Sequence, residues 1–242
     1  WPPLRYVWRA IGPDGSKATE SPQGQVRAGD HVRWRRPRLC GDSSKPRNLM
    51  FYAFKGMVPV VDPSAFVHPQ ANVTGDVWIG KNVYIGPGAV LRGDWGRITI
   101  KEGSNVQENC IIHSFPGKDV ILEKSAHVGH GAIIHGAFLG ENCLIGMNAV
   151  LMDDVQIGKN CLVGALAFVK ARTIVPDGAV MVGNPAKMVK QMSEKDIAWK
   201  TEGTQWYQRL PKECHDTLTP CQPLQEGDLN RPRSSGGFEP KS

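Results

Sequence analysis

The sequence predicts an all-β solenoid, a left-handed parallel β-helix of hexapeptide repeats followed by a C-terminal α-helix. Three observations predict this fold class. Aliphatic residues recur every six positions between Val67 and Val175, Gly repeatedly follows the aliphatic residue, as in IGKNV and IGPGA, and the period stops after NPAK at 184–187. Neither a helical period nor simple strand alternation makes such a pattern over so long a stretch.

Residues 1–49 take no part in this pattern. They are rich in Arg, Pro, Gly and Trp, and they carry ten Lys and Arg against four Asp and Glu. Met50 then opens a stretch, MFYAFKGMVPVV, that is typical of the start of a protein. We therefore expect 1–49 to be a non-native or disordered basic extension. From residue 50 onward acidic and basic residues balance, so we predict no nucleic-acid partner.

Residues 50–190 carry the six-residue period and form the predicted β-helix. Each hexapeptide makes one side of a triangular prism, so three make a coil of about 18 residues with the aliphatic side chains inside. Small residues let the chain turn at each corner. Solenoids of this kind wind left-handed. The stretch 114–126 breaks the period and is expected to loop out, and loops on a rigid scaffold often hold sites.

The remaining residues predict a helix and a tail. Ser193, with Asp196 three residues later, is typical of a helix N-cap of the capping-box kind, so 191–218 is the predicted C-terminal helical segment. Gly203 interrupts it, which allows either one kinked helix or two. Residues 219–242 are poor in aliphatic residues and rich in Pro, Gly and Ser, which predicts a flexible tail.

The cysteines and the hydropathy of the sequence indicate in which cellular compartment the protein is expected. The six cysteines form no CxxC pair and no close spacing, which favours reduced thiols in a cytoplasmic protein. No apolar run is long enough to span a bilayer, so we predict no membrane partner.

The candidate metal ligands are three histidines. His113 and His135 each follow an inward aliphatic residue and are 22 positions apart, one coil plus four residues that the 114–126 loop can absorb. Because coils stack at about 4.8 Å, both imidazoles can converge on one ion. His130 lies on the preceding side of the prism and should point away within the same chain. A trimer would bring a neighbour's His130 to the pair.

Three histidines with an open fourth position are typical of a catalytic zinc site. Fe2+ and Co2+ also accept three imidazoles, so the sequence leaves the native metal open.

Three segments, LRGDWGRITI (91–100), NVQENCIIH (105–113) and HVGHGAIIHG (127–136), resemble the γ-class carbonic anhydrases, which are homotrimers of left-handed β-helices with metal at the subunit interfaces. The segments FPGKDVILEKSAHVGHGAIIHG and SEKDIAWKTEGTQWYQ are similar to the branch of that family containing the phenylacetic-acid-degradation protein PaaY and its carnitine-operon relative. The resemblance covers about residues 50–225.

The resemblance also implies roles for particular residues. It places the metal ligands on His113, His130 and His135, with His130 supplied by the adjacent subunit. Gln107 matches the residue that orients the metal-bound water, and Glu108 is a second candidate catalytic residue. The implied interface and structural residues are Arg92, Asp94 and Asn105.

The implied activity is that of a metal-dependent hydrolase. The PaaY-like segments imply a thioesterase for phenylacetyl-CoA-type thioesters, in which a metal-bound hydroxide attacks the carbonyl carbon. The first alternative is a γ-class carbonic anhydrase acting on CO2 and bicarbonate, although the acidic proton-shuttle loop of that class is absent here. The fold is also shared by hexapeptide acyltransferases, and a non-catalytic accessory role is the remaining alternative.

Overall fold

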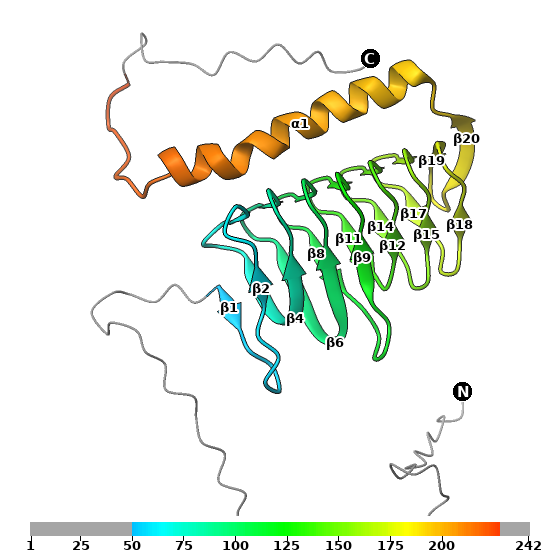
Figure 1. Cartoon of the computed structure of the whole chain (residues 1–242). Coiled ribbons are helices and arrows are strands. Elements are labelled where there is room, and N and C mark those ends of the chain that lie inside the picture. Colours follow the sequence, from blue (N-terminus) through cyan, green and yellow to red (C-terminus); the bar gives the residue numbers. More distant parts are fainter. Residues whose placement is uncertain (1–49, 228–242) are drawn as a thin grey trace, which may run out of the picture. The chain divides into compact units, whose positions relative to one another are not determined.

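The computed structural model describes residues 50–227. The extension predicted for 1–49 and the last part of the predicted tail, 228–242, lie outside the described residues. The described chain is a parallel β-solenoid that ends in one helix, which confirms the predicted fold class (Figure 1).

The solenoid has three faces, and successive coils pair in parallel on each face. The first and second faces are joined because β4 (Asn72–Ile79) and β6 (Val90–Ile100) run without a break around one corner. The first face adds β1 (Phe51–Tyr52), β8 (Ile111–His113), β11 (Ile133–His135), β14 (Val150–Leu151) and β17 (Phe168–Val169). The second face adds β2 (Val60–Val61), β9 (Val120–Leu122), β12 (Phe138–Leu139), β15 (Gln156–Ile157) and β18 (Ile174–Val175).

The third face is a separate sheet of eight strands. Its last pair, β19 and β20, is antiparallel, whereas all other neighbours on this face are parallel. Its strands are β3 (Phe66–Val67), β5 (Tyr84–Ile85), β7 (Asn105–Val106), β10 (His127–Val128), β13 (Leu144–Ile145), β16 (Leu162–Val163), β19 (Ala179–Val182) and β20 (Lys187–Gln191).

The core is the axis of the prism, and the hexapeptide period fills it. Of the aliphatic positions that set this period, Val67 is partly buried and the others are buried, as in the column Ile85, Val106, Val128 and Ile145 along the third face. The corners need left-handed backbone, and Asn142 and Asn148 supply it with φ of 55° each, a conformation that Asn tolerates better than most residues.

The interruption at 114–126 is shorter than the sequence predicts. Val120–Leu122 rejoins the second face as β9, pairing with β6 and β12, so only the residues around 114–119 leave the coil. Val120 and Leu122 are fully buried, which explains why this part of the stretch returns to the core.

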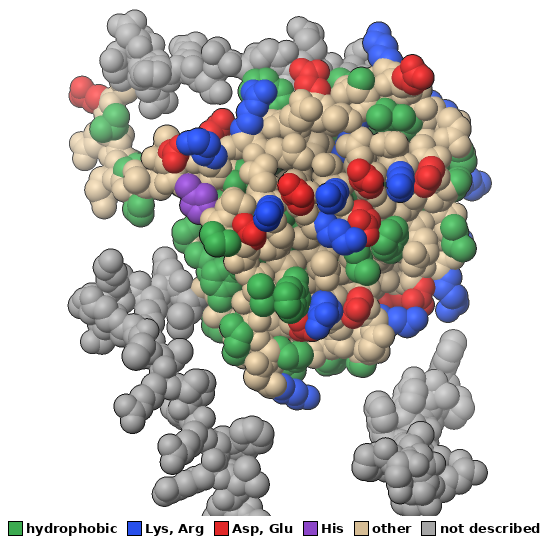
Figure 2. All heavy atoms as spheres, in the orientation of Figure 1, with side chains coloured by type: hydrophobic (Ala, Val, Ile, Leu, Met, Phe, Trp, Pro, Cys, Tyr) green, Lys and Arg blue, Asp and Glu red, His purple; other side chains and the backbone are tan. Residues whose placement is uncertain are grey.

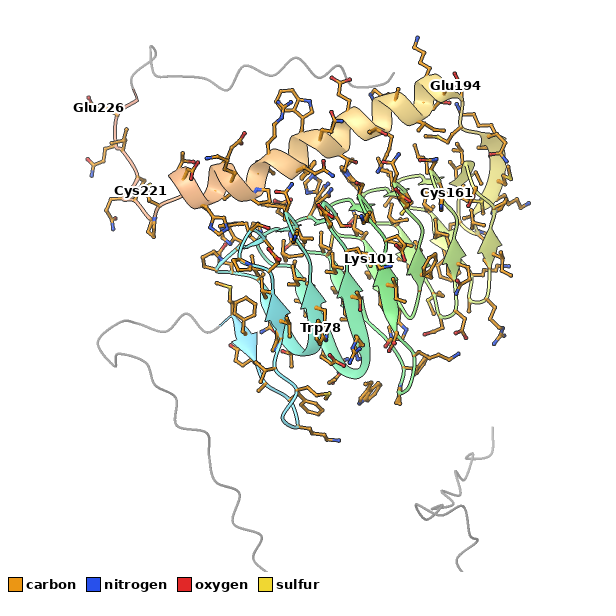
Figure 3. The ribbon with its side chains drawn as sticks, in the orientation of Figure 1. Trp78, Lys101, Cys161, Glu194, Cys221 and Glu226 are labelled. Atoms are coloured by element: carbon orange, nitrogen blue, oxygen red, sulfur yellow. The ribbon has the colours of Figure 1, made fainter. Side chains whose placement is uncertain are left out.

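The C-terminal helix α1 (Glu194–Thr217) is continuous. Ser193 caps it in a capping box with Asp196, as predicted. Gly203 does not divide the helix, because side chains on one face, including Lys200 and Thr204, are buried against the solenoid and outweigh the cost of one glycine. The helix runs back along the coils, with Glu194 near the last ones and Cys221 beyond its other end (Figure 3).

The surface in view carries acidic and basic side chains interspersed, with hydrophobic side chains gathered near the first coils (Figure 2). No helix within residues 50–227 has the length and apolar character needed to cross a membrane.

Candidate metal centre

His113 and His135 stand side by side on the first face. They are direct register partners, since β8 and β11 pair with His135 opposite His113. Their ring centroids are 5.3 Å apart, and Nδ1 of His113 lies 3.3 Å from Nε2 of His135. The predicted convergence of these two histidines is therefore present within one chain.

Each of the two histidines has its own carboxylate partner. Nε2 of His113 lies 3.0 Å from Oδ1 of Asp94, and Nδ1 of His135 lies 2.6 Å from Oδ1 of Asp153. A carboxylate accepts, so these ring nitrogens carry the protons. The two remaining nitrogens, which face each other, then both present lone pairs. Two lone pairs this close repel each other unless a cation lies beside them, and the guanidinium of Arg92 does so here, with Nη2 3.3 Å from Nδ1 of His113.

Arg92 completes this cluster. Its Nη1 donates to Oδ2 of Asp94 at 2.7 Å, and its Nη2 lies 3.3 Å from Nδ1 of His113. Burial raises the pKa of Asp94, but hydrogen bonds from Arg92 and His113 outweigh it, so this pKa lies below its usual range. Burial lowers the pKa of His113, which keeps the imidazole neutral and able to bind a metal.

His130 lies elsewhere, just after β10 on the third face. Its Nδ1 donates to Oε2 of Glu108, and the hydroxyl of Tyr84 donates to Oε1 of Glu108 at 3.2 Å. Within residues 50–227 of one chain, no three His, Cys, Asp or Glu side chains form a group that could hold a metal ion. This agrees with the expectation that His130 cannot join the other two histidines in the same chain.

Gln107 and Asn105 also lie on the third face, beneath α1. Both are buried, and Nε2 of Gln107 donates to Oδ1 of Asn105 at 3.0 Å and lies 2.6 Å from Nε2 of His127. Burial, together with Lys200 and His130, lowers the pKa of His127 to about 3, so its imidazole is neutral. Among the described residues, Nδ2 of Asn105 is the buried side-chain nitrogen without a hydrogen-bond partner.

One chain thus divides the predicted residues into two groups. The first face and its edge hold Arg92, Asp94, His113 and His135. The third face holds Asn105, Gln107, Glu108 and His130. We call these the histidine-pair half and the His130 half of the candidate site.

Sequence reasoning missed several residues of both halves. Asp153 follows His135 by 18 positions, one coil, and this spacing could have revealed it. Trp95 and Phe115 are half exposed, and their rings lie 5.3 and 5.1 Å from those of His113 and His135. No spacing in the sequence indicates the Tyr84 contact with Glu108.

A groove adjoins the His130 half. It lies between α1 and the third face, has a volume of about 700 Å3, and has Gln107 and His130 in its lining. Lys200 also lines it and is buried, donating to the carbonyl of Ser125 at 2.9 Å and to Oδ1 of Asn142 at 2.7 Å. Burial lowers the pKa of Lys200 to about 8.

The solenoid and its hexapeptide coils define the class of hexapeptide-repeat proteins. The family model described as bacterial transferase hexapeptide (six repeats) matches residues 59–93 and 136–171. The chain belongs to the family of the carnitine operon protein CaiE. The protein of that name from Escherichia coli K12 is 45% identical over 188 residues, which cover 78% of this chain and 96% of the relative. The CaiE protein of Salmonella agona is 44% identical over 196 residues, which cover 80% of this chain and 99% of the relative.

Solved structures give the same fold. A hexapeptide transferase family protein from Anaplasma phagocytophilum is 33% identical with a TM-score of 0.65, covering 68% of this chain and 97% of its own. A protein of Bacillus cereus described as an acetyltransferase is 29% identical with a TM-score of 0.68, and the match covers 70% of this chain and 99% of its own. These comparisons confirm the predicted family and support an enzymatic role.

Proposed function

We propose that this protein is a metal-dependent hydrolase of acyl-CoA thioesters, of the PaaY type, with its site between the subunits of a homotrimer. One observation carries the proposal. Each of the three predicted ligands, His113, His130 and His135, is hydrogen-bonded to a carboxylate of its own chain. Metal-binding histidines characteristically donate their second ring nitrogen to a carboxylate, which fixes the ring and makes the other nitrogen a better ligand.

The histidine pair fits a zinc ion. Two nitrogens that each lie about 2.0–2.1 Å from one zinc ion in tetrahedral arrangement are about 3.3 Å apart. The facing nitrogens of His113 and His135 have this separation, 3.3 Å. Imidazole ligands serve Fe2+ and Co2+ as well, so the proposal covers these metals. The bound ion would supply a nucleophile at neutral pH and stabilise the developing oxyanion.

The division of the site into two halves supports the trimer. Among residues 50–227 of one chain no third imidazole joins the histidine pair, because His130 is on a different face, and a neighbouring chain could supply it.

The protein side chains position the reactants. Asp94 and Asp153 hold the protons of His113 and His135 away from the space between the two rings. Gln107 is fixed by Asn105 and His127, so its amide is a rigid polar group at one end of the groove. In the reaction, water adds to the thioester carbonyl carbon, the carbon–sulfur bond breaks, and CoA leaves as the thiol.

A thioester fits the surroundings better than CO2. A groove of about 700 Å3 next to the His130 half has room for a drug-sized group, whereas CO2 needs only a small pocket. Trp95 and Phe115 pack against the histidine pair, and the two carboxylates beside it, Asp94 and Asp153, are engaged by the histidines themselves. Rapid CO2 hydration requires a proton relay, and aromatic rings cannot provide one.

The test is thiol release from phenylacetyl-CoA by the zinc-loaded full chain. We expect release that disappears in His113→Ala and persists in His68→Ala, a matched control in the first coil whose Nδ1 accepts a local hydrogen bond from the Gln70 amide. Release that depends on an added amine acceptor would indicate an acyltransferase instead. CO2 hydration without thiol release would indicate a carbonic anhydrase. A chain active in neither assay would contradict the proposal and favour an accessory role.

A further inference from the structure

The groove beneath α1 has the dimensions of an extended chain. On the solenoid side its lining starts at Gln107 on the level of β7 and continues over β10, β13 and β16. Three steps of about 4.8 Å give a length of about 14 Å. On the helix side the lining runs from Trp199 to Tyr207, and eight residues of helix give about 12 Å. The volume of about 700 Å3 over this length leaves a cross-section of about 50 Å2, enough for one narrow group.

The groove is polar at one end and apolar along its length. Gln107, His127 and His130 lie at the level of β7 and β10, whereas Met147, Leu162 and Trp199 line the part farther along. Lys200 is turned to the solenoid, where its ammonium donates to Ser125 and Asn142.

The lining backbone offers few hydrogen bonds to a ligand. The amides of Leu144 and Gly146 donate to the carbonyls of Cys161 and Val163 in the next coil. The helix backbone is likewise paired within α1. A ligand with amide groups, such as the pantetheine arm of CoA, would leave these groups without partners, which is unfavourable. The apolar part of the groove therefore suits a hydrocarbon chain or an aryl group.

The groove continues directly into the His130 half, because Gln107 and His130 belong to both. We propose that the groove between α1 and the third face binds the acyl group of the thioester, with the carbonyl at the Gln107 end and the hydrocarbon beneath α1. This inference rests on the proposed function. It makes α1 the element that determines acyl-chain length.

Gly203 is the specificity-determining position in this arrangement. It lies on the groove side of α1 between Trp199 and Trp206. Glycine in the interior of a helix is unfavourable compared with alanine. At the groove wall a glycine leaves space for the ligand, because it has no side chain, and this explains why it stands there.

The experiment measures kcat/KM of the zinc-loaded full chain for a series from acetyl-CoA to decanoyl-CoA. We expect an increase of roughly threefold to fourfold per methylene until the groove is full, since each buried methylene adds that factor. Gly203→Leu should abolish the increase with chain length, so that its kcat/KM for the longer chains no longer exceeds its kcat/KM for acetyl-CoA by this factor. The matched control is Gln205→Leu, which adds the same side chain at an exposed position of the same helix.

A direct binding measurement separates the two hypotheses. Calorimetric titration with the same acyl-CoA series should show affinity that rises with chain length, and Gly203→Leu should lose this rise. If no thioester is cleaved but this pattern appears in binding, the proposed function fails and the acyl groove stands. If turnover and binding are both independent of chain length, or if Gly203→Leu and Gln205→Leu behave alike, the groove does not hold the acyl group.

Discussion

Asp153→Asn tests whether the carboxylates beside the histidines serve a metal. Oδ1 of Asp153 lies 2.6 Å from Nδ1 of His135, and this charge strengthens the imidazole as a ligand through its other nitrogen. The asparagine has nearly the same shape but no charge. We expect zinc affinity to fall about 10- to 100-fold, the usual effect of removing such a partner, which corresponds to about 1.4–2.7 kcal/mol.

The assay is competition for zinc between the protein and a chromophoric chelator at pH 7.5, which reports affinity without requiring activity. Thermal unfolding gives a second measurement, because saturating zinc should stabilise the variant by about 1.4–2.7 kcal/mol less than the wild-type protein.

The neighbouring Asp154→Asn is the matched control. Asp154 has a φ of 57°, which Asn tolerates, and its carboxylate pairs with Lys118 at the surface, 2.9 Å away, rather than with a histidine. We expect its zinc affinity to match that of the wild-type protein. Equal affinities for all three proteins, or equal losses in both variants, would refute the argument that Asp153 supports His135 as a ligand.

Three further predictions concern stability, each measured by urea unfolding at fixed protein concentration. Ile134→Ala should cost about 2–5 kcal/mol, because Ile134 is fully buried and its truncation leaves a cavity in the core. Gly96→Ala should cost about 1–3 kcal/mol, since its Cβ would collide with the carbonyl oxygen of Lys118. Burial lowers the pKa of Lys200 to about 8, so between pH 8 and 10.5 the unfolded chain holds a proton that the folded chain lacks. The free energy of unfolding of the wild-type protein, minus that of Lys200→Met, should therefore rise by about 3 kcal/mol from pH 8 to pH 10.5. A difference that does not change with pH would contradict the lowered pKa of Lys200.

The solenoid could be predicted because its determinants are local. Each inward residue, such as Ile85 or Ile145, is fixed by its distance from the previous one, and the same spacing places His113 beside His135. The loop after His113 was too long in the prediction, because the return of Val120 to the core depends on a position in a distant coil.

The rest of the candidate site depends on contacts that spacing does not fix. Glu108 could be placed near the site, but its contact with His130 depends on side-chain direction at a corner. The groove requires α1 to lie on one particular face, and the helix sequence does not say which. A lysine in a polar segment is expected at the surface, so the burial of Lys200 could not be foreseen.

The antiparallel strand β20 has a consequence for solubility. A stack of parallel coils ends in an open row of backbone donors and acceptors, which is a template for end-to-end polymerisation. On the third face β20 occupies this row after β19, and this exposed strand carries Lys187 and Lys190, the second of which pairs with Asp196 at 3.2 Å. A second molecule adding there would have to bring its own charges against these lysines. On this face the chain thus ends its own repeat with a strand that runs in the opposite direction to the coils.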